Sequence, residues 1–324
     1  MPSISLPTMK MPKWLRFGRP SVKRSGGWIG VHVTPDHLLV AHARPNRDGK
    51  LNIKFQQCFS GDDRIADLLA WQKENGLSRT KSNLLLLPSE YQILQIDAPV
   101  VDAAELKAAT RWQVKDFLDF PVDEAALDCM VVPSSPAETA APKLLSVVSR
   151  KAVVGTWMNR WHAEKMTLNC IDIPEMALRN LAVMAAGAEA AVFLHLGWET
   201  TNLLIVWQES LCTFRQLNIG AEQLVDLNDF ERADLIGRIA LELQRTTDAF
   251  GLQFFAANLQ CIYVSSVMDP VGIATSLNGQ MDFAIEPFVL SDWVTVEDEL
   301  REEDLDRRLD YTLAIGAALR GEVS

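Results

Sequence analysis

Hydrophobic and polar residues alternate in the same way in two distant parts of the chain. From Trp28 to Gly61 the alternation predicts three short strands, WIGVHV, HLLVAHA and LNIKFQQCF, that lead into a helix. From Ala191 to Gly220 it predicts the same unit again, with the strands AVFLHLG, TNLLIVW and LCTFRQLN. Two copies of one supersecondary unit indicate a duplicated α/β fold with two lobes and a cleft between them.

The segment between the two copies departs from this pattern. Asp102 and Glu105 predict a capping box for a helix that runs to about Asp119, with strands on either side. A long amphipathic helix is expected later in the chain, from about Asp229 to Phe250. The expected domains are a basic N-terminal arm (1–27), a first lobe (28–88 and 151–189), a small inserted α+β subdomain (89–150) and a second lobe (190–324).

The composition of the chain argues against several classes of protein. The five cysteines are far apart and lack CxxC spacing, which argues against a disulfide framework or a zinc site. We expect neither a membrane span nor a secretory signal, because no apolar run has the required length or position. Residues 1–27 carry +6, and subtracting this from the net charge of −11 leaves −17 for residues 28–324. Such an acidic body argues against nucleic acid as a partner.

The basic arm can be interpreted in two ways. Its membrane-surface candidates combine cations with interfacial aromatic residues, and such a segment can rest on an anionic lipid surface. These candidates are Lys10, Lys13, Trp14, Arg16, Phe17 and Arg19. The alternative is a solvated arm without fixed structure, because prolines and serines interrupt the segment.

The turn after each first strand is the natural place for this unit to hold a phosphate. Here the turns read HVTPDH and HLGWET, and neither is a glycine-rich loop. His32 and His195 occupy matching places, which suggests either a pair of metal ligands or two buried core histidines. We favour core histidines and expect no metal site, because no Cys, Asp or Glu cluster accompanies them at ligand spacing.

Two charged segments are interpreted as surface features. Glu242 lies four residues after Arg238 and three before Arg245, which predicts a surface ladder of ion pairs worth about 0.5 kcal/mol each. A contact in the cleft or between the lobes is the alternative for this ladder. The acidic run Glu297–Asp310 is expected to form a solvated helix face.

Several segments keep a characteristic order and spacing across residues 28–320. They are WIGVHV, LPSEYQILQIDAP, ELKAATRWQVKDFLDFPVDE, IDIPEMALRNL, LHLGWETTNLLIV, FRQLNIGAEQL, ELQRTTDAF and YTLAIGAALR. In this order they resemble the actin-like ATPase superfamily and, within it, the PilM family of pilus assembly proteins. The likeness extends to the MshI branch, which serves agglutinin-type (MSHA) type IV pili. The resemblance implies an actin-like, ribonuclease H-like duplicated fold with an inserted α+β subdomain.

The resemblance also implies a degenerate nucleotide cleft. The cleft positions are Gly30, His32, Thr34, Asp36, His195, Gly197, Thr201, Ser265 and Ser266. His32 and His195 stand where the two hairpins of an ATPase carry acidic residues, and Leu39 replaces a lysine. Thr34 and the serine pair replace glycines that let the backbone approach the nucleotide, and Asp36 is the nearest possible substitute acid. We therefore expect no catalytic residues and no cofactor, with ATP and Mg²⁺ disfavoured.

In the resembling family, a groove between the first lobe and the insertion takes a short cytoplasmic N-terminal peptide of an inner-membrane pilus protein. The groove candidates in this chain are Trp112, Phe117, Phe120 and Pro121. Aromatic anchors give peptides affinity, although such residues are also common in cores. The resemblance implies a non-catalytic cytoplasmic scaffold, peripheral to the inner membrane, with the pilus motor ATPase as a further partner.

Three alternatives remain open at this point. The chain can be an active or nucleotide-binding ATPase of pilus assembly, but it lacks the acid and the glycine-rich donors that such chemistry needs. It can be the equivalent platform component of a type II secretion system. A sugar or acyl kinase of the same fold is least favoured, because no catalytic acid or substrate pocket is marked in the sequence.

Overall fold

The computed structural model describes residues 27–45, 51–102, 104–133, 142–254, 256–296 and 310–321 of the 324-residue chain. The basic arm, with all the membrane-surface candidates from Lys10 to Arg19, lies outside these residues. So does the acidic run up to residue 309. Within the described ranges, no helix is both long enough and apolar enough to cross a bilayer.

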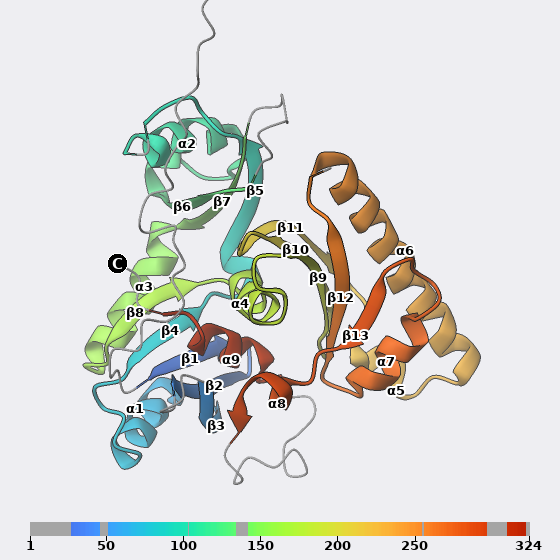
Figure 1. The fold of residues 1–324 in the computed structure, drawn as a ribbon. Helices are drawn as coiled ribbons and strands as arrows, with labels where there is room; N and C mark the ends of the chain where they lie inside the picture. Colours follow the sequence, from blue (N-terminus) through green and yellow to red (C-terminus); the bar gives the residue numbers. More distant parts are fainter. Residues whose placement is uncertain are drawn as a thin grey trace, which may run out of the picture.

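The first lobe is built on a six-stranded sheet in the order β14-β3-β2-β1-β4-β8 (Figure 1). Its strands are β1 (Trp28–Val33), β2 (His37–Pro45), β3 (Leu51–Ser60), β4 (Lys81–Leu85), β8 (Leu168–Asp172) and β14 (Thr295–Val296). Successive residues of β1 face opposite sides of this sheet. Ile29, Val31 and Val33 pack in the core beneath α1 (Arg64–Glu74) and α3 (Lys151–Ala163). Gly30 and His32 face the other side, toward the second lobe.

The second lobe repeats this plan with a five-stranded sheet in the order β11-β10-β9-β12-β13. Its strands are β9 (Ala190–Leu196), β10 (Thr201–Trp207), β11 (Ser210–Leu217), β12 (Leu259–Ser266) and β13 (Ala284–Pro287). In each lobe the first strand pairs antiparallel with the second and parallel with the strand that follows the helical segment. The duplication predicted from the sequence is therefore confirmed.

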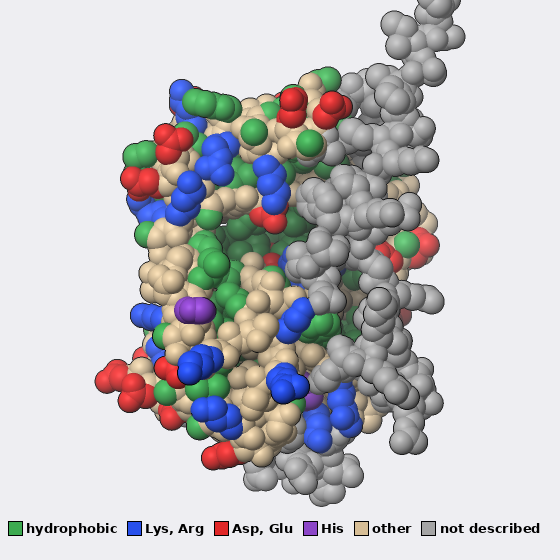
Figure 2. Space-filling view, turned by 90° about the vertical axis from the view of Figure 1, so that its left-hand side faces the viewer, with side chains coloured by type: hydrophobic (Ala, Val, Ile, Leu, Met, Phe, Trp, Pro, Cys, Tyr) green, Lys and Arg blue, Asp and Glu red, His purple; other side chains and the backbone are tan. Residues whose placement is uncertain are grey.

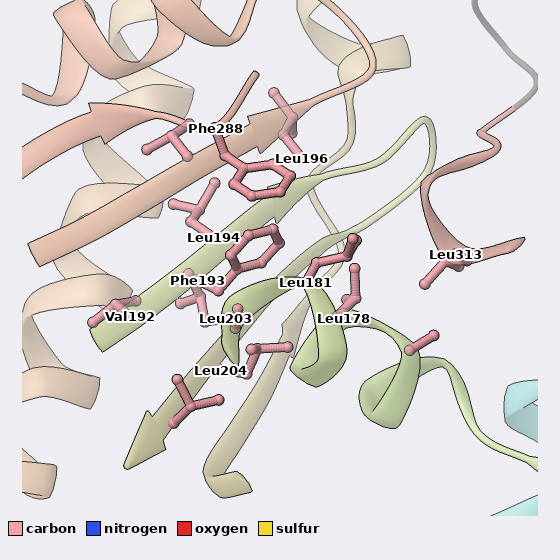
Figure 3. Packing of buried hydrophobic residues seen from close by; sticks show 14 of the residues in the cluster. Leu178, Leu181, Val192, Phe193, Leu194, Leu196, Leu203, Leu204, Phe288 and Leu313 are labelled. Carbon is pink, nitrogen blue, oxygen red and sulfur yellow. The ribbon is translucent and has the colours of Figure 1, made fainter. Parts of the chain in front are cut away.

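Helices cover both faces of the second sheet, which explains why every residue of β9 is buried. Helix α4 (Pro174–Ala186) lies on one face, and α6 (Asp229–Gln253) and α7 (Pro270–Leu277) lie on the other (Figure 1). Figure 3 shows Leu178 and Leu181 of α4 pointing toward β9, where the Phe193 and Phe288 rings meet edge to face at 5.0 Å. The long helix expected from about Asp229 is thus present.

The inserted segment forms a three-stranded sheet in the order β5-β7-β6, covered on one face by α2 (Leu106–Val114). Its strands are β5 (Tyr91–Asp97), β6 (Ala125–Val131) and β7 (Lys143–Arg150). The predicted capping box is wrong, because Glu105 is the N-cap and makes no side-chain cap hydrogen bond. The buried stripe of α2 is Leu106, Thr110 and Val114, since these residues lie four apart and face the small sheet.

The C-terminal segment does not belong to the second lobe, which corrects the expected boundary of 190–324. Strand β14 joins the first sheet beside β3, and α9 (Thr312–Ala318) packs against β1, β2 and β4. Figure 1 shows α9 over the first sheet, with α4 between it and the second sheet. The chain therefore returns to the first lobe after completing the second, and α9 contacts the layer that joins them.

Two glycines allow α9 to lie this close to its neighbours. A Cβ atom on Gly30 of β1 would overlap the carbonyl oxygen of Ala314 in α9. A Cβ atom on Gly316 of α9 would overlap the carbonyl oxygen of Ala177 in α4. The small-residue sequence of α9 is therefore a packing requirement, because any larger residue at these contacts would push the helix out of its layer.

We predict that Gly30→Ala lowers the free energy of unfolding by about 3 kcal/mol, because backbone atoms of α9 cannot yield to the added methyl group. Urea unfolding followed by circular dichroism measures this change. The matched control is Gly237→Ala in α6, where an added Cβ meets no atom within 4 Å, so that stability should rise by about 0.5–1 kcal/mol. Equal stabilities of the two variants would contradict this packing role.

Candidate functional site

The second hairpin meets the carboxylate of Asp310, just before α9, through His195. His195 Nε2 lies 2.6 Å from Asp310 Oδ2, and His195 Nδ1 lies 3.2 Å from the hydroxyl oxygen of Ser265. Because a carboxylate only accepts hydrogen bonds, Nε2–H is the donor to Asp310. The other carboxylate oxygen of Asp310 accepts the backbone N–H of Thr312, the first residue of α9, at 3.0 Å.

His32 approaches the same residue from the first lobe. It lies near Asp310, and its Nδ1 atom is inaccessible to water without a partner among the described residues. Burial lowers the pKa of His32 to about 4, although the charge of Asp310 acts in the opposite direction. The nearby His195 lowers it further. His32 is therefore neutral at physiological pH.

Asp310 keeps its charge in this buried position. Burial alone would raise the pKa of its carboxyl, but the attraction of His195 and the hydrogen bonds from His195 and Thr312 lower it to about 2. Gly197 lies beside the pair, because a Cβ atom there would stand in ordinary van der Waals contact with Asp310 Oδ2 and His195 Nε2.

The Ser265–His195–Asp310 series has the residue types of a hydrolytic triad but not its accessibility. Ser265 and His195 are 5% and 1% exposed, so no substrate can reach the hydroxyl. The described residues also contain no group of three His, Cys, Asp or Glu side chains placed to hold a metal ion. The prediction that His195 is a satisfied core histidine is confirmed by its two partners.

The first hairpin turn is closed by its own hydrogen bonds. The Thr34 N–H donates to the carbonyl oxygen of His37 at 2.9 Å, and the His37 N–H donates to the Thr34 hydroxyl. Arg64 of α1 donates to the carbonyl oxygens of Thr34 and Pro35. Asp36 is exposed at this turn, and Asp310 is the acid that reaches the centre. Leu39 is buried in the core.

The second hairpin turn is closed by the start of α5 (Ala221–Val225). The N–H groups of Ala221 and Glu222 donate to the carbonyl oxygens of Gly197 and Trp198 at 2.9 and 3.0 Å. Gly220 permits this contact, because a Cβ atom there would overlap the backbone of the turn. The Thr201 hydroxyl donates to the carbonyl oxygen of Ile219 at 2.6 Å and fixes the base of the same loop.

The third loop, after β12, is closed as well. The Val267 N–H donates to the carbonyl oxygen of Leu196 at 3.1 Å, and the Ser266 hydroxyl accepts the Met268 N–H at 3.0 Å. In or beside each of the three loops, at least one backbone N–H group therefore has an internal acceptor, whereas an anion-binding loop points several such groups at its ligand.

The four groove candidates do not form one set. Trp112 and Phe117 are 68% and 62% exposed, and Pro121 is also exposed. Phe120 instead packs on the small core of the insertion, with the Arg150 guanidinium 4.2 Å from the centre of its ring. Phe120 is thus a packing residue, whereas Trp112 and Phe117 form an exposed aromatic surface on the α2 side.

Sequence reasoning missed the opposite face of the small sheet. Tyr91, Ile93, Met130 and Val147 are half-buried there and pack against the main core rather than against α2. Figure 2 shows a hollow with hydrophobic side chains between the inserted subdomain above and the first lobe below. The alternation of β5, β6 and β7 could have revealed this second apolar face, because residues on both sides of each strand are apolar.

Buried polar groups join the insertion to the main body. The Tyr91 hydroxyl donates to Glu175 at 2.7 Å, and burial followed by the charge of Glu175 raises the pKa of Tyr91. Burial likewise raises the pKa of Glu175. Asp172 forms an ion pair with Arg320, just after α9. The segment after β8 is therefore tied both to the insertion and to the C-terminal segment.

Comparisons with known proteins agree with this architecture. No protein-family model matches the sequence, and a search of curated proteins finds no match. A solved structure described as the PilM–PilN type IV pilus biogenesis complex superposes with a TM-score of 0.66 at 17% identity, covering 91% of this chain and 98% of that one. This chain has the actin-like ATPase fold.

Two further structures are similar at lower scores. The cytoplasmic domain of EpsL, an inner-membrane component of the Vibrio cholerae type II secretion system, gives a TM-score of 0.42 at 9% identity, covering 63% of this chain and 76% of its own. A Bacteroides thetaiotaomicron protein of actin-like ATPase fold and unknown function gives 0.43 at 6% identity, covering 83% and 92%.

Within this actin-like fold, two predictions from the sequence need correction. Asp310, expected on a solvated face, is the carboxylate of the central cluster, because the helix that begins two residues later is buried between the lobes. Glu242 forms ion pairs with Arg245, as expected, and with Arg215 of β11. Arg215 therefore takes the place that the sequence predicted for Arg238. The signal for Asp310 was its position just before the small-residue helix.

We predict that Asp310→Asn lowers the free energy of unfolding at pH 7 by about 2–4 kcal/mol, because it removes the partner of a buried histidine. Chemical unfolding of both proteins measures the difference. Asp36→Asn is the control, and at this exposed turn it should change stability by less than about 0.5 kcal/mol. A similar, small effect of both changes would show that the Asp310 contact contributes little.

Proposed function

We propose that this actin-like protein is a non-catalytic scaffold of a type IV pilus assembly platform, of the PilM kind and of its MSHA-type MshI branch. It binds the cytoplasmic N-terminal segment of an inner-membrane pilus protein and works without nucleotide turnover. The observation that carries this proposal is the His32–Asp310–His195 cluster, because histidines and a retained carboxylate fill the place where the two hairpins of an ATPase meet its nucleotide. The superposition on PilM over nearly the whole chain supports the choice of system.

The closed loops support an assembly role over turnover. Phosphoryl transfer needs backbone donors and a metal-binding acid arranged around the phosphates. Here the N–H groups of the loops already have internal acceptors, and Asp310 is paired with His195. We propose that the protein functions without ATP or Mg²⁺. The fold then serves to hold its lobes and insertion in a fixed arrangement.

The half-buried face of the small sheet opposite α2 is the surface that we propose for the partner peptide. A half-buried apolar wall with a polar end suits a short segment that inserts apolar side chains and adds a polar anchor. Tyr91, Ile93, Met130 and Val147 supply the apolar wall, and Glu175 lies at its end. The exposed Trp112 and Phe117 on the α2 side are the second candidate surface.

Two further parts of the proposal concern the setting. The protein acts in the cytoplasm at the inner membrane, where the basic arm rests on anionic lipid and the pilus motor ATPase is a second partner. The secretion-system alternative is retained because the EpsL cytoplasmic domain shares this fold class. Identification of the membrane partner distinguishes the two systems.

We predict that a synthetic peptide matching the N-terminal cytoplasmic segment of the pilus partner binds at micromolar concentration, measured by fluorescence anisotropy. Met130→Glu should weaken binding at least about tenfold, because it places a charge in the apolar wall. Trp112→Ala is the matched control and should leave the affinity unchanged. Adding Mg-ATP should change neither the affinity nor the melting temperature.

Other outcomes would redirect the proposal. A loss of affinity in Trp112→Ala alone would place the peptide on the α2 side. Absence of binding by well-folded wild-type protein would contradict the scaffold role. A Mg²⁺-dependent rise in melting temperature with ATP would show that nucleotide binding survives in this fold.

A further inference from the structure

The outer side of α6 carries large apolar side chains that are exposed. Phe230, Leu241 and Leu252 are 84%, 48% and 88% exposed. Each lies 11 residues from the next, and because 11 residues complete about three helical turns, all three project from the same side of the helix. Leu243 and Phe250, by contrast, are buried in the main core. The three exposed residues therefore form an apolar stripe along the helix, here called the α6 stripe.

Two glycines lie on the same outer side, inside the helix. Gly237 is one turn before Leu241, and Gly251 is next to Leu252. A Cβ atom added to either glycine would meet no atom within 4 Å, so no close contact among the described residues requires glycine there. Glycine weakens a helix relative to alanine, because it loses more backbone freedom on folding. A second helix that packs closely on the stripe accounts for glycine at both positions.

We propose that the α6 stripe is a self-association surface, on which a second copy of this chain packs its own α6 in antiparallel orientation. Figure 1 shows α6 along the outside of the second lobe, away from the first lobe and the inserted sheet. This inference goes beyond the scaffold function and does not depend on it, because the stripe and the hollow beneath the inserted sheet lie on different parts of the molecule. A dimer of this kind leaves both hollows accessible.

The spacing of the stripe fits a two-fold axis. When two copies pair through the same surface, each residue on one side of the axis meets the residue at the same distance on the other side. An axis at Leu241 brings the two Leu241 side chains together. The same axis places Phe230 of each copy against Leu252 of the other, because both lie 11 residues from Leu241. All three members of the stripe thus find an apolar partner.

The charges beside the stripe are largely complementary in this arrangement. Asp234 lies seven residues before Leu241 and Arg245 four residues after it, on the same flank of the helix, so the axis brings each within reach of the other in the second copy. Arg245 is 60% exposed and already pairs with Glu242, but a guanidinium has further donors. Asp248 comes level with Asp234 of the second copy, and this pair of like charges opposes association.

The size of the contact predicts a weak dimer. Helix α6 has 25 residues and is therefore about 37 Å long. Packed helices lie about 8–10 Å apart, so a pair of this length buries about 700–800 Å² in total. Stable complexes bury roughly 1,200 Å² or more. We therefore expect a dissociation constant of about 100 µM, at which the protein pairs only where it is concentrated.

The first test measures the self-association of the full-length protein by sedimentation velocity between about 10 and 500 µM. Wild type should dimerise with the dissociation constant of about 100 µM. Gly237→Ala should weaken association at least about tenfold, because its methyl group stands where the two helices meet. The same change favours the helix, so the variant should melt at a higher temperature than wild type. Loss of folding then cannot explain a loss of association.

The matched control is Gly155→Ala in α3. Gly155 also lies inside a helix, and a Cβ atom added there meets no atom within 4 Å, but it belongs to the first lobe and not to the α6 stripe. This variant should dimerise like wild type. A wild-type protein that stays monomeric at the highest concentration, or equal association of wild type and Gly237→Ala, would overturn the proposal.

The second test determines the orientation of the pair by oxidative cross-linking with copper phenanthroline. Leu241→Cys should form a covalent dimer, because the axis brings this position next to its own copy. Leu252→Cys should cross-link to Phe230→Cys but not to itself, since the two copies of residue 252 lie about 33 Å apart. Wild type, with its five cysteines, gives the background. Self-cross-linking of Leu252→Cys at the yield of Leu241→Cys would overturn the antiparallel arrangement.

Discussion

The close packing of α9 between the first sheet and α4 is the constraint on which the other features depend. Glycine at position 30 of β1 and at position 316 of α9 brings the helix into backbone contact with both neighbours. That placement sets the first turn of α9 where β1 and β9 approach each other. There the carboxylate of Asp310 accepts hydrogen bonds from His195 and from the Thr312 N–H. A packing requirement in the C-terminal helix thereby determines the chemistry between the lobes.

The same constraint explains how an ATPase fold can persist without the features of an ATPase. In the proposed function, the His195–Asp310 pair supplies the polar contact between the lobes that a nucleotide and its metal supply in an ATPase. The three loops close on themselves through Thr34, Gly197 and Ser266. The lobes and the inserted sheet remain, and these are the parts that a scaffold needs. A binding role that needs only the arrangement of the lobes and the inserted sheet is then sufficient to maintain the fold.

Much of the fold could be predicted from the sequence, because period-two alternation and repeated strand triplets report local structure directly. The membership of α9 in the first lobe could not, since it arises from contacts between residues 30 and 314 that no local pattern records. The same limit hid Asp310 within an acidic run. For the same reason, the sequence pointed to the aromatic residues Trp112 and Phe117 as groove residues. The half-buried Ile93 and Met130 cannot be told from ordinary core residues by sequence alone.

The central claim is that the His195–Asp310 contact holds the lobes together in place of a nucleotide. A double-mutant cycle of His195→Gln and Asp310→Asn, followed by urea unfolding at pH 7, measures that contact most directly. The account predicts a coupling energy of about 2 kcal/mol, as expected for a buried hydrogen bond to a charged group. Additive effects, with a coupling energy below about 0.5 kcal/mol, would contradict it.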